Sequence, residues 1–312
     1  MSVVRTPARV NGDRSSLRSV LAALAANTAI ATAKGIAAAL TGSAALFAET
    51  LHTIADAGNE VFLFIALRRS RLPPDASHPL GYGPERYYWA LLAAVGMFVV
   101  GGAISIWEGV KALLDPPEIV DFWIGVAVLV IALVLDGTSR TIAVRTLRGQ
   151  AKARGTTMRA LVRDSPDPTV TTVYLEDTVD VIGAALALLA LVLHQTTGAE
   201  LPDALATLVI GCLLAYIAVR LASRNRRLLT NQTLPDPALE RLRSRLAEQP
   251  GVISVGRLEA VYLGPSDILA AAEVRVDDGL SAPEVAQTLE RVRSDLCRQL
   301  PVITRLYLTP VD

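Results

Sequence analysis

The sequence has few charged residues, few aromatic residues and almost no cysteine. Charged residues make up 19 % of the chain and aromatic residues 5 %, and the formal net charge at pH 7 is zero. The chain therefore lacks the excess of positive charge that nucleic-acid binding uses, and we expect no nucleic-acid partner. The two cysteines, Cys212 and Cys297, lie in unrelated segments, so we expect both to be free and reduced rather than part of a disulfide framework.

Apolar residues are abundant instead. Hydrophobic residues make up 52 % of the sequence and the mean hydropathy is +0.41, which is too apolar for an ordinary soluble domain. The first residues, MSVVRTPARVNGDRSSLR, are polar and basic and lack the short apolar core of a signal peptide, so we expect the first apolar run to remain as a helix. The composition predicts a membrane protein embedded in a lipid bilayer.

Six segments are long enough to cross a hydrocarbon core, which needs about 20 residues of helix. They are 20–40, 43–67, 87–114, 122–144, 168–194 and 204–222. The second and fifth contain several acidic residues, so their assignment depends on their neighbours and on the even number of spans. Basic residues precede the first span and follow the second, fourth and sixth, whereas the other connections carry no Lys or Arg. The positive-inside rule therefore predicts that both termini are cytoplasmic.

The last quarter of the chain has the pattern of a small soluble domain. A helix is expected from Asp236 to about residue 247, because Asp is a favoured N-cap and Pro follows it. Strands are expected at 252–262 and 268–276, and a capping box at Ser281 begins a second helix. A last strand covers 302–308. The order αββαβ predicts a ferredoxin-like α+β domain.

The second expected span carries ionisable side chains where a bilayer makes them expensive. Glu49, His52, Asp56 and Asn59 follow a 3, 4, 3 spacing, so a helix places all four on one stripe. An imidazole and a carboxylate one turn apart form half of a divalent-metal site. The alternative for His52 is a core histidine bonded to a backbone carbonyl, but ionisable groups inside a membrane are usually functional. We therefore favour metal binding by His52 and Asp56.

The fifth expected span brings further carboxylates to the same depth. His52 and Asp177 each lie nine residues into their spans from opposite sides, or about 14 Å, which is near the midplane of a core about 30 Å thick. Glu176 and Asp180 are neighbouring candidates. Burying several carboxylates at this depth is costly unless a cation neutralises them. The two spans together predict an intramembrane site for a divalent cation.

Three other polar residues of the expected spans are candidates for proton relay or gating. They are Glu49, Asn59 and Asp136. Lys34 on the first span could pair with Glu49, and we favour that pairing over metal ligation by Glu49. Asp136 could pair with Arg140 one helical turn away, and this structural pairing stands beside the relay role.

These motifs resemble the cation diffusion facilitator family, whose members export divalent metals in exchange for protons. The resemblance runs through TGSAALFAETLHTIAD, DASHPLGYGPERYYW, IWEGVKALLDPP, LED and the αββαβ tail. It implies a homodimer and a tetrahedral site with two ligands from each of two spans. His52, Asp56 and Asp177 fall on three ligand positions and Val173 on the fourth, so Glu176, Asp180 or a water would complete the site. The YLEDT form and the Leu-Gly-Pro turn are more similar to the branch that contains mitochondrial-type zinc transporters.

The resemblance also implies a second metal site in the loop after the second span. Asp75 and His78 match two of its ligands, whereas Tyr82 stands where the family has histidine. The alternative is a turn in which Gly81 and Gly83 adopt unusual backbone angles. The last domain contains no histidine, so we do not expect regulatory metal there.

We therefore expect a secondary transporter rather than an enzyme, without a resident cofactor. It would export a divalent transition metal, Zn²⁺ first and Fe²⁺, Co²⁺ or Mn²⁺ as alternatives, against protons by alternating access. Imidazole with carboxylates favours such ions over Mg²⁺ and Ca²⁺, and metal and protons compete for the same ligand atoms. A proton-coupled exporter of non-metal cations or drugs and a membrane-embedded metalloenzyme remain as alternatives.

This interpretation divides the chain into four parts. They are a polar tail at 1–18, a six-helix transport domain at 19–223, a linker at 224–234 and a cytoplasmic domain at 235–312. The abundance of Arg and Ala over Lys is typical of a bacterial genome, so we expect the bacterial cytoplasmic membrane.

Overall fold

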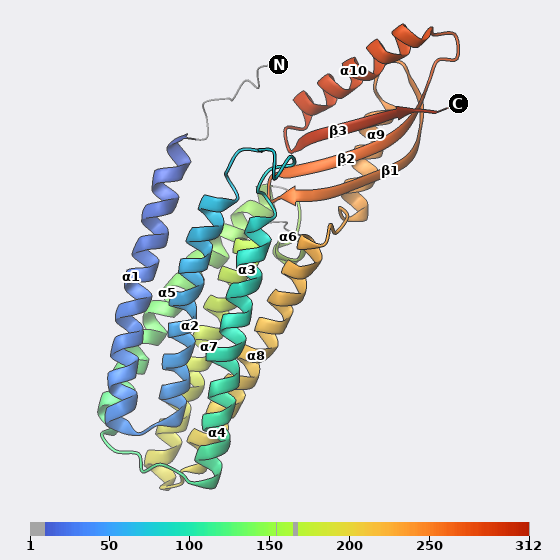
Figure 1. Ribbon diagram of the computed structural model, residues 1–312. Coiled ribbons are helices and arrows are strands. Elements are labelled where there is room, and N and C mark those ends of the chain that lie inside the picture. The colour runs from blue at the N-terminus through green and yellow to red at the C-terminus, as the bar shows by residue number, and fades with distance from the viewer. Residues whose placement is uncertain (1–9, 154, 165–167, 312) are drawn as a thin grey trace. The chain divides into compact units, whose positions relative to one another are not determined.

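The structure is a computed structural model that describes the backbone of residues 10–153, 155–164 and 168–311 (Figure 1). Side chains are described for residues 24–153, 155–162 and 174–311. The chain forms two compact units. Of the described residues, the first unit comprises 10–68, 88–153, 155–164 and 169–225, and the second comprises 69–87, 168 and 226–311.

Long helices running alongside one another form the first unit (Figure 1). Over the described residues these are α1 (Val10–Thr41), α2 (Ala44–Arg69), a composite segment, α5 (Phe122–Ala153), α7 (Pro168–Thr197) and α8 (Leu201–Leu229). The composite segment joins α3 (Glu85–Gly96), the π-helical η2 (Met97–Ala103) and α4 (Ile104–Leu114), and the short α6 (Met158–Asp164) lies between α5 and α7. Five of the six expected spans lie within one of these segments, and the second, 43–67, begins one residue before α2, which confirms the helical membrane fold.

Four of the described segments are long and apolar enough to cross a membrane by length and composition. They are Glu85–Leu114, Phe122–Ala153, Tyr174–Thr197 and Leu201–Leu229. The helices α5 and α8 continue beyond the expected ends at 144 and 222, because hydropathy marks only the part in the hydrocarbon core. Their extensions carry basic residues, which are favourable near a helix C-terminus.

Glycines allow the composite segment to pack closely against α8. A Cβ added at Gly102 would lie 3.1 Å from the Ala215 Cα, and one at Gly211 would lie 2.8 Å from the Ile106 backbone nitrogen. Close approach of this kind is how helices associate in membranes, where small residues let backbones meet. The π-helical turn at η2 lies beside this contact, and such turns occur mostly as local bulges in functional helices.

The second unit contains the expected αββαβ domain. Its elements are α9 (Asp236–Ala247), β1 (Val252–Gly264), β2 (Asp267–Val276), α10 (Ala282–Gln299) and β3 (Ile303–Pro310). The sheet has the order β1-β2-β3, with β1 and β2 antiparallel and β2 and β3 parallel. The helix α9 contacts β1, α10 contacts β3, and the two helices contact each other. The ferredoxin-like order predicted from the sequence is confirmed.

Alternation and capping explain these elements locally. Every second residue of β2 is buried, which is the period of a strand with one face on a core. At the start of α10, Glu284 accepts hydrogen bonds from the Ser281 hydroxyl and the Ser281 backbone N–H, at 2.6 and 2.8 Å. The backbone bond is one half of the capping box, whose other half is the Glu284 backbone N–H donating to the Ser281 hydroxyl. The two bonds that the Glu284 carboxylate accepts hold its pKa below its usual value.

The loop before α3 belongs to the second unit rather than to the helix bundle. The Arg305 guanidinium donates to the Pro79 carbonyl oxygen at 2.7 Å. A Cβ at Gly83 would overlap the Leu263 carbonyl oxygen, so only glycine permits this close approach. The sequence grouped this loop with the transmembrane domain because connections between spans are normally assigned that way.

Candidate metal centre

The N-terminus of α2 is capped by a residue from α8. The Asp203 carboxylate accepts hydrogen bonds from the Ser43 hydroxyl at 2.5 Å and from the backbone N–H groups of Ala44 and Ala45 at 2.6 and 3.2 Å. The first N–H groups of a helix have no partner within the helix, so an acceptor from a neighbouring helix satisfies them. Asp203 is buried. This cap ties the helix that carries His52 and Asp56 to α8, and the sequence analysis did not identify it.

Three predicted residues come together between α2 and α7. Ligand atoms of His52, Asp56 and Asp180 all lie within 4.8 Å of one another. The His52 Nε2 lies 3.6 Å from an Asp56 carboxylate oxygen and 3.4 Å from an Asp180 carboxylate oxygen. Two ligands of a tetrahedral zinc ion with bonds of about 2.0–2.2 Å lie about 3.3–3.6 Å apart. The His52 Nε2 is therefore spaced from both oxygens as co-ligands of one ion would be.

Several polar atoms of this cluster have no hydrogen-bond partner in the part of the chain that the structure describes. Among the described residues, both ring nitrogens of His52 and one carboxylate oxygen of Asp56 are buried without one. His52 is fully buried, and neither of its ring nitrogens bonds a backbone carbonyl among the described residues. This excludes the alternative of a core histidine satisfied by such a bond in this structure. Buried polar groups are normally paired, and unpaired ligand atoms on α2 that face the Asp180 carboxylate of α7 match the chemistry of a bound cation.

Glu176 lies next to this cluster on α7. It is one helical turn before Asp180, and the Asn59 amide nitrogen donates to a Glu176 carboxylate oxygen at 2.6 Å. Asn59 lies on α2 beyond Asp56 on the same stripe. Both Asn59 and Glu176 are half-buried. Glu176 thus lies on the helix that carries Asp180 but is not one of the residues whose ligand atoms come together.

Asp177 does not join the cluster, although its depth in the helix is suitable. The Ser139 hydroxyl on α5 lies 3.4 Å from an Asp177 carboxylate oxygen, so this side chain points toward α5. With about 100° of rotation per residue, Glu176 lies about 40° from Asp180 on one side and Asp177 about 60° from it on the other, so Asp177 lies at the edge of the face that carries Asp180. The side chain of Val173, which the resemblance placed at the fourth position, lies outside the described residues. The structure thus brings Asp180 rather than Asp177 to His52 and Asp56.

The two residues with structural alternatives differ in their partners. Glu49 is paired with Lys34, whose ammonium lies 3.0 Å from a Glu49 carboxylate oxygen. Asp136 does not take the expected partner, because Arg140 donates to the Thr178 hydroxyl instead, at 3.4 Å. One Asp136 carboxylate oxygen is buried without a hydrogen-bond partner among the described residues.

The loop residues Asp75 and His78 form a hydrogen-bonded turn. Asp75 accepts from the Ser77 hydroxyl at 2.7 Å, from the Tyr82 hydroxyl at 2.7 Å, and from the backbone N–H groups of Ser77 and His78 at 2.9 and 2.8 Å. The Ser77 and Tyr82 hydroxyls, followed by the backbone donors, hold the pKa of Asp75 below its usual range. Gly81 has a φ of 90°, as the turn interpretation expects, whereas Gly83 does not have a positive φ and is required for close approach instead. Metal binding by Asp75 and His78 stays a prediction.

Comparison with known proteins identifies the family. Residues 20–230 match the family model described as the cation efflux transmembrane domain. The chain belongs to the cation efflux family. This confirms the resemblance noted from the sequence.

Relatives of this family member come from several branches. It is 33 % identical over 237 residues to the human proton-coupled zinc antiporter SLC30A9, mitochondrial, covering 76 % of this chain and 42 % of that protein. It is 30 % identical over 262 residues to metal tolerance protein C4 of Arabidopsis thaliana, covering 84 % and 57 %. It is 26 % identical over 285 residues to the cation-efflux pump FieF of Escherichia coli O127:H6, covering 91 % and 89 %. The chain thus spans less than half the length of its SLC30A9 relatives, and the names describe transporters rather than enzymes.

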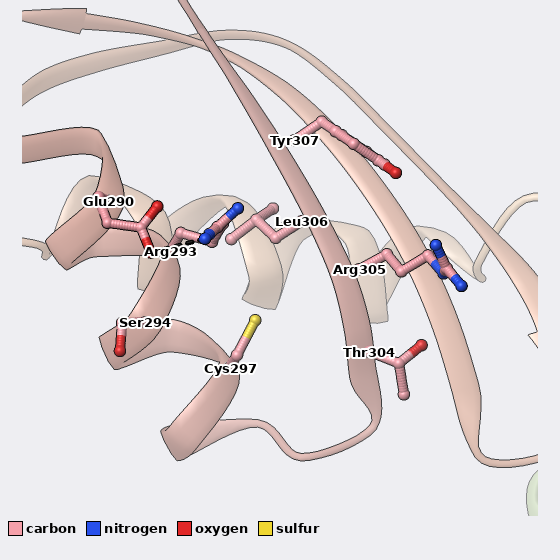
Figure 2. Close-up of a pocket in the computed structure, with 8 residues that line it drawn as sticks. All are labelled: Glu290, Arg293, Ser294, Cys297, Thr304, Arg305, Leu306 and Tyr307. Atoms are coloured by element: carbon pink, nitrogen blue, oxygen red, sulfur yellow. Dashed lines mark hydrogen bonds and ion pairs between the residues drawn. The ribbon is translucent and has the colours of Figure 1, made fainter. Parts of the chain in front are cut away.

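A separate cavity lies on the C-terminal domain between α10 and β3 (Figure 2). It measures about 300 Å³ and is lined by Glu290, Arg293, Ser294, Cys297, Thr304, Arg305, Leu306 and Tyr307. Its two arginines are already engaged, Arg293 with Glu290 at 2.6 Å and Arg305 with the loop before α3. Burial raises the pKa of the Cys297 thiol, so it is not a thiolate near neutral pH. This cavity has none of the unpaired buried ligands that mark the site in the helices.

Proposed function

We propose that this protein exports divalent transition-metal cations, with Zn²⁺ as the preferred cargo, in exchange for protons. The observation that carries the proposal is the cluster of buried His52 and Asp56 with partly buried Asp180, whose atoms have ligand spacing; among the described residues, both His52 ring nitrogens and one Asp56 oxygen have no hydrogen-bond partner. A site with one imidazole and carboxylate oxygens favours Zn²⁺, Co²⁺ and Fe²⁺ over Mg²⁺ and Ca²⁺, and it also accepts Mn²⁺.

Glu176 is the residue that we place at the fourth ligand position. It shares a face of α7 with Asp180, and its present partner is the neutral amide of Asn59. Exchange of that amide for the metal would give a set of one nitrogen and three carboxylates. Asn59 then acts as a gating residue that holds Glu176 when the metal is absent.

Proton coupling follows from the ligand chemistry. His52 must be neutral and the carboxylates ionised to bind the metal, so protons arriving from the other side displace it. Alternating access around a site near the midplane carries metal one way and protons the other. We place Asp136 on the proton path, since one of its carboxylate oxygens is buried without a partner. The distribution of basic residues supports cytoplasmic termini in a bacterial plasma membrane, and the family resemblance supports a homodimer.

Metal binding and flux in proteoliposomes test this proposal. Purified protein is reconstituted with an imposed pH gradient, and uptake of Zn²⁺, Co²⁺, Fe²⁺ and Mn²⁺ is measured. Asp180→Asn and Asp177→Asn form a matched pair on one helix. Loss of a ligand in Asp180→Asn should weaken zinc binding by more than the roughly 10- to 100-fold cost of losing an outer-shell partner, whereas Asp177→Asn should bind zinc like the wild type.

The alternatives give different results. If the wild type neither binds zinc nor takes up any of the four metals under the pH gradient, metal transport is refuted. Unchanged proton-coupled activity in His52→Ala would favour an exporter of non-metal cations. If Asp177→Asn loses zinc binding and Asp180→Asn keeps it, then α7 presents Asp177 rather than Asp180 to α2.

A further inference from the structure

A completely buried ion pair connects α1 and α2 beside the proposed metal site. Lys34 and Glu49 are 1 % and 0 % exposed, and their charged atoms lie 3.0 Å apart. The Lys34 ammonium also donates to the Thr53 hydroxyl at 3.0 Å, and that hydroxyl donates to the Glu49 backbone carbonyl at 3.0 Å. Lys34 is therefore bound to two successive turns of α2.

The same glutamate also contacts α7. A Cβ added at Gly183 would overlap one Glu49 carboxylate oxygen and lie 3.0 Å from the carboxylate carbon. This oxygen is buried and has no hydrogen-bond partner among the described residues. One Glu49 oxygen is thus held by Lys34 while the other is pressed against the backbone of α7 at a residue without a side chain.

These contacts lie one helical turn from the proposed ligands on both helices. Glu49 is three residues before His52 on α2, and Gly183 is three residues after Asp180 on α7. The contact between Glu49 and Gly183 therefore sets the spacing of α2 and α7 where the ligands must converge. If Lys34 did not hold Glu49, this carboxylate would be free to turn toward the metal ligands along its own stripe.

We propose that Lys34, Glu49 and Gly183 form a positioning device that sets the geometry of the metal site. Lys34 of α1 fixes the Glu49 carboxylate, which lies against Gly183 and keeps His52 and Asp56 opposite Asp180. None of the three residues binds the cargo itself. A buried ion pair is not in itself a reason for stability, so its persistence inside the membrane calls for a role such as this. The inference rests on the proposed transport site.

Equilibrium binding of Co²⁺ to the full-length protein in detergent tests this device. The visible absorption of bound Co²⁺ reports coordination geometry, which general destabilisation of the fold would not shift while the protein stays folded. Lys34→Met, Glu49→Gln and Gly183→Ala should each weaken Co²⁺ binding at least about tenfold and shift its spectrum. The matched control is the exposed pair Lys111 and Glu108, 3.5 Å apart, and Lys111→Met with Glu108→Gln should leave both measurements at wild type.

Two further variants keep the test decisive if the charge variants fold poorly. Gly96→Ala adds a methyl group where no atom lies within 4 Å, and it is the control for Gly183→Ala. Thr53→Val keeps both charges, removes the second acceptor of Lys34 together with the hydroxyl bond to the Glu49 backbone carbonyl, and should weaken Co²⁺ binding in the same direction.

The outcomes separate this inference from the proposed function. If the wild type does not bind Co²⁺, or if Asp180→Asn binds it equally well, the transport site itself is wrong. If the wild type binds and Asp180→Asn does not, but the variants of Lys34, Glu49 and Gly183 keep wild-type affinity and spectrum, only the positioning role is wrong. Because the pair acts as a unit, we expect Lys34→Met and Glu49→Gln together to cost less than the sum of the single variants.

Discussion

Removal of the Asp203 carboxylate should destabilise the helix bundle through the N-terminus of α2. In Asp203→Ala, the Ser43 hydroxyl and the N–H groups of Ala44 and Ala45 lose their acceptor in a buried environment. A lost N-cap costs about 1 kcal/mol, and each buried donor left unpaired costs about 1–3 kcal/mol. The bond from the Ala45 N–H, at 3.2 Å, contributes least to this loss. Removing the buried carboxylate also recovers part of the free energy that its desolvation costs. We therefore expect a net loss of about 2–4 kcal/mol.

Asp203→Asn separates the hydrogen bonds from the charge. The Asn side-chain oxygen can accept from the two N–H groups of α2 while its amide donates to the Ser43 hydroxyl, and Asn is as good an N-cap as Asp. This variant should therefore stay within about 1 kcal/mol of wild type. The measurement is denaturant unfolding of the purified protein in mixed micelles, with zinc affinity recorded in parallel.

Two results would refute the capping argument. If Asp203→Ala unfolds at the wild-type midpoint, the bonds do not hold α2 in the folded protein. If Asp203→Asn is as unstable as Asp203→Ala, the charge and not the hydrogen bonding is the source of stability. Where the cap does hold α2, zinc binding should weaken in Asp203→Ala, because α2 carries His52 and Asp56.

Three further predictions concern the second unit. Because its folded-state pKa is lowered, the Asp75 carboxylate should stay ionised at pH values where a free aspartate is protonated. The stability that its hydrogen bonds contribute is therefore fully present above the pKa of the unfolded state. It is lost only as the pH falls through the lower pKa of the folded state. Tyr82→Phe should raise that pKa toward normal in a carboxyl-carbon NMR titration, and an unchanged value would contradict the assigned bond. Glu284, whose pKa is also lowered, should make α10 less resistant to hydrogen exchange as the pH drops through its folded pKa, and Glu284→Gln should abolish that dependence. Arg305→Ala should speed hydrogen exchange in the loop before α3, whereas Arg298→Ala should not, because Arg298 pairs within its own helix.

Properties that depend on one helix or on local chain geometry could be predicted from the sequence. His52 and Asp56 lie one turn apart in any helix, so their common face needs no knowledge of the fold. The pairing of Lys34 with Glu49 was predicted because two opposite charges in adjacent spans have few other partners. The αββαβ order followed from caps, turns and alternation, which are local signals.

The rotation of one helix against another could not be predicted in the same way. Counting residues from the membrane edge placed Asp177 at the right depth, but depth does not say which side of α7 faces α2. Packing against α5 turns Asp177 toward Ser139 and leaves Asp180 opposite His52. The cap from Asp203 depends likewise on where α8 begins relative to α2 in space.

The sequence by itself determined a helical membrane protein, its family and the common face of His52 and Asp56 on α2, because hydropathy, periodicity and motif spacing are properties of the chain read in order. The tertiary structure alone decided that Asp180 is the acid of α7 that lies beside His52 and Asp56, that Glu49 contacts Gly183, and that Asp203 caps α2. The physical reason is that such contacts join residues more than 100 positions apart, and close packing of whole helices selects among side chains that the sequence presents as equivalent.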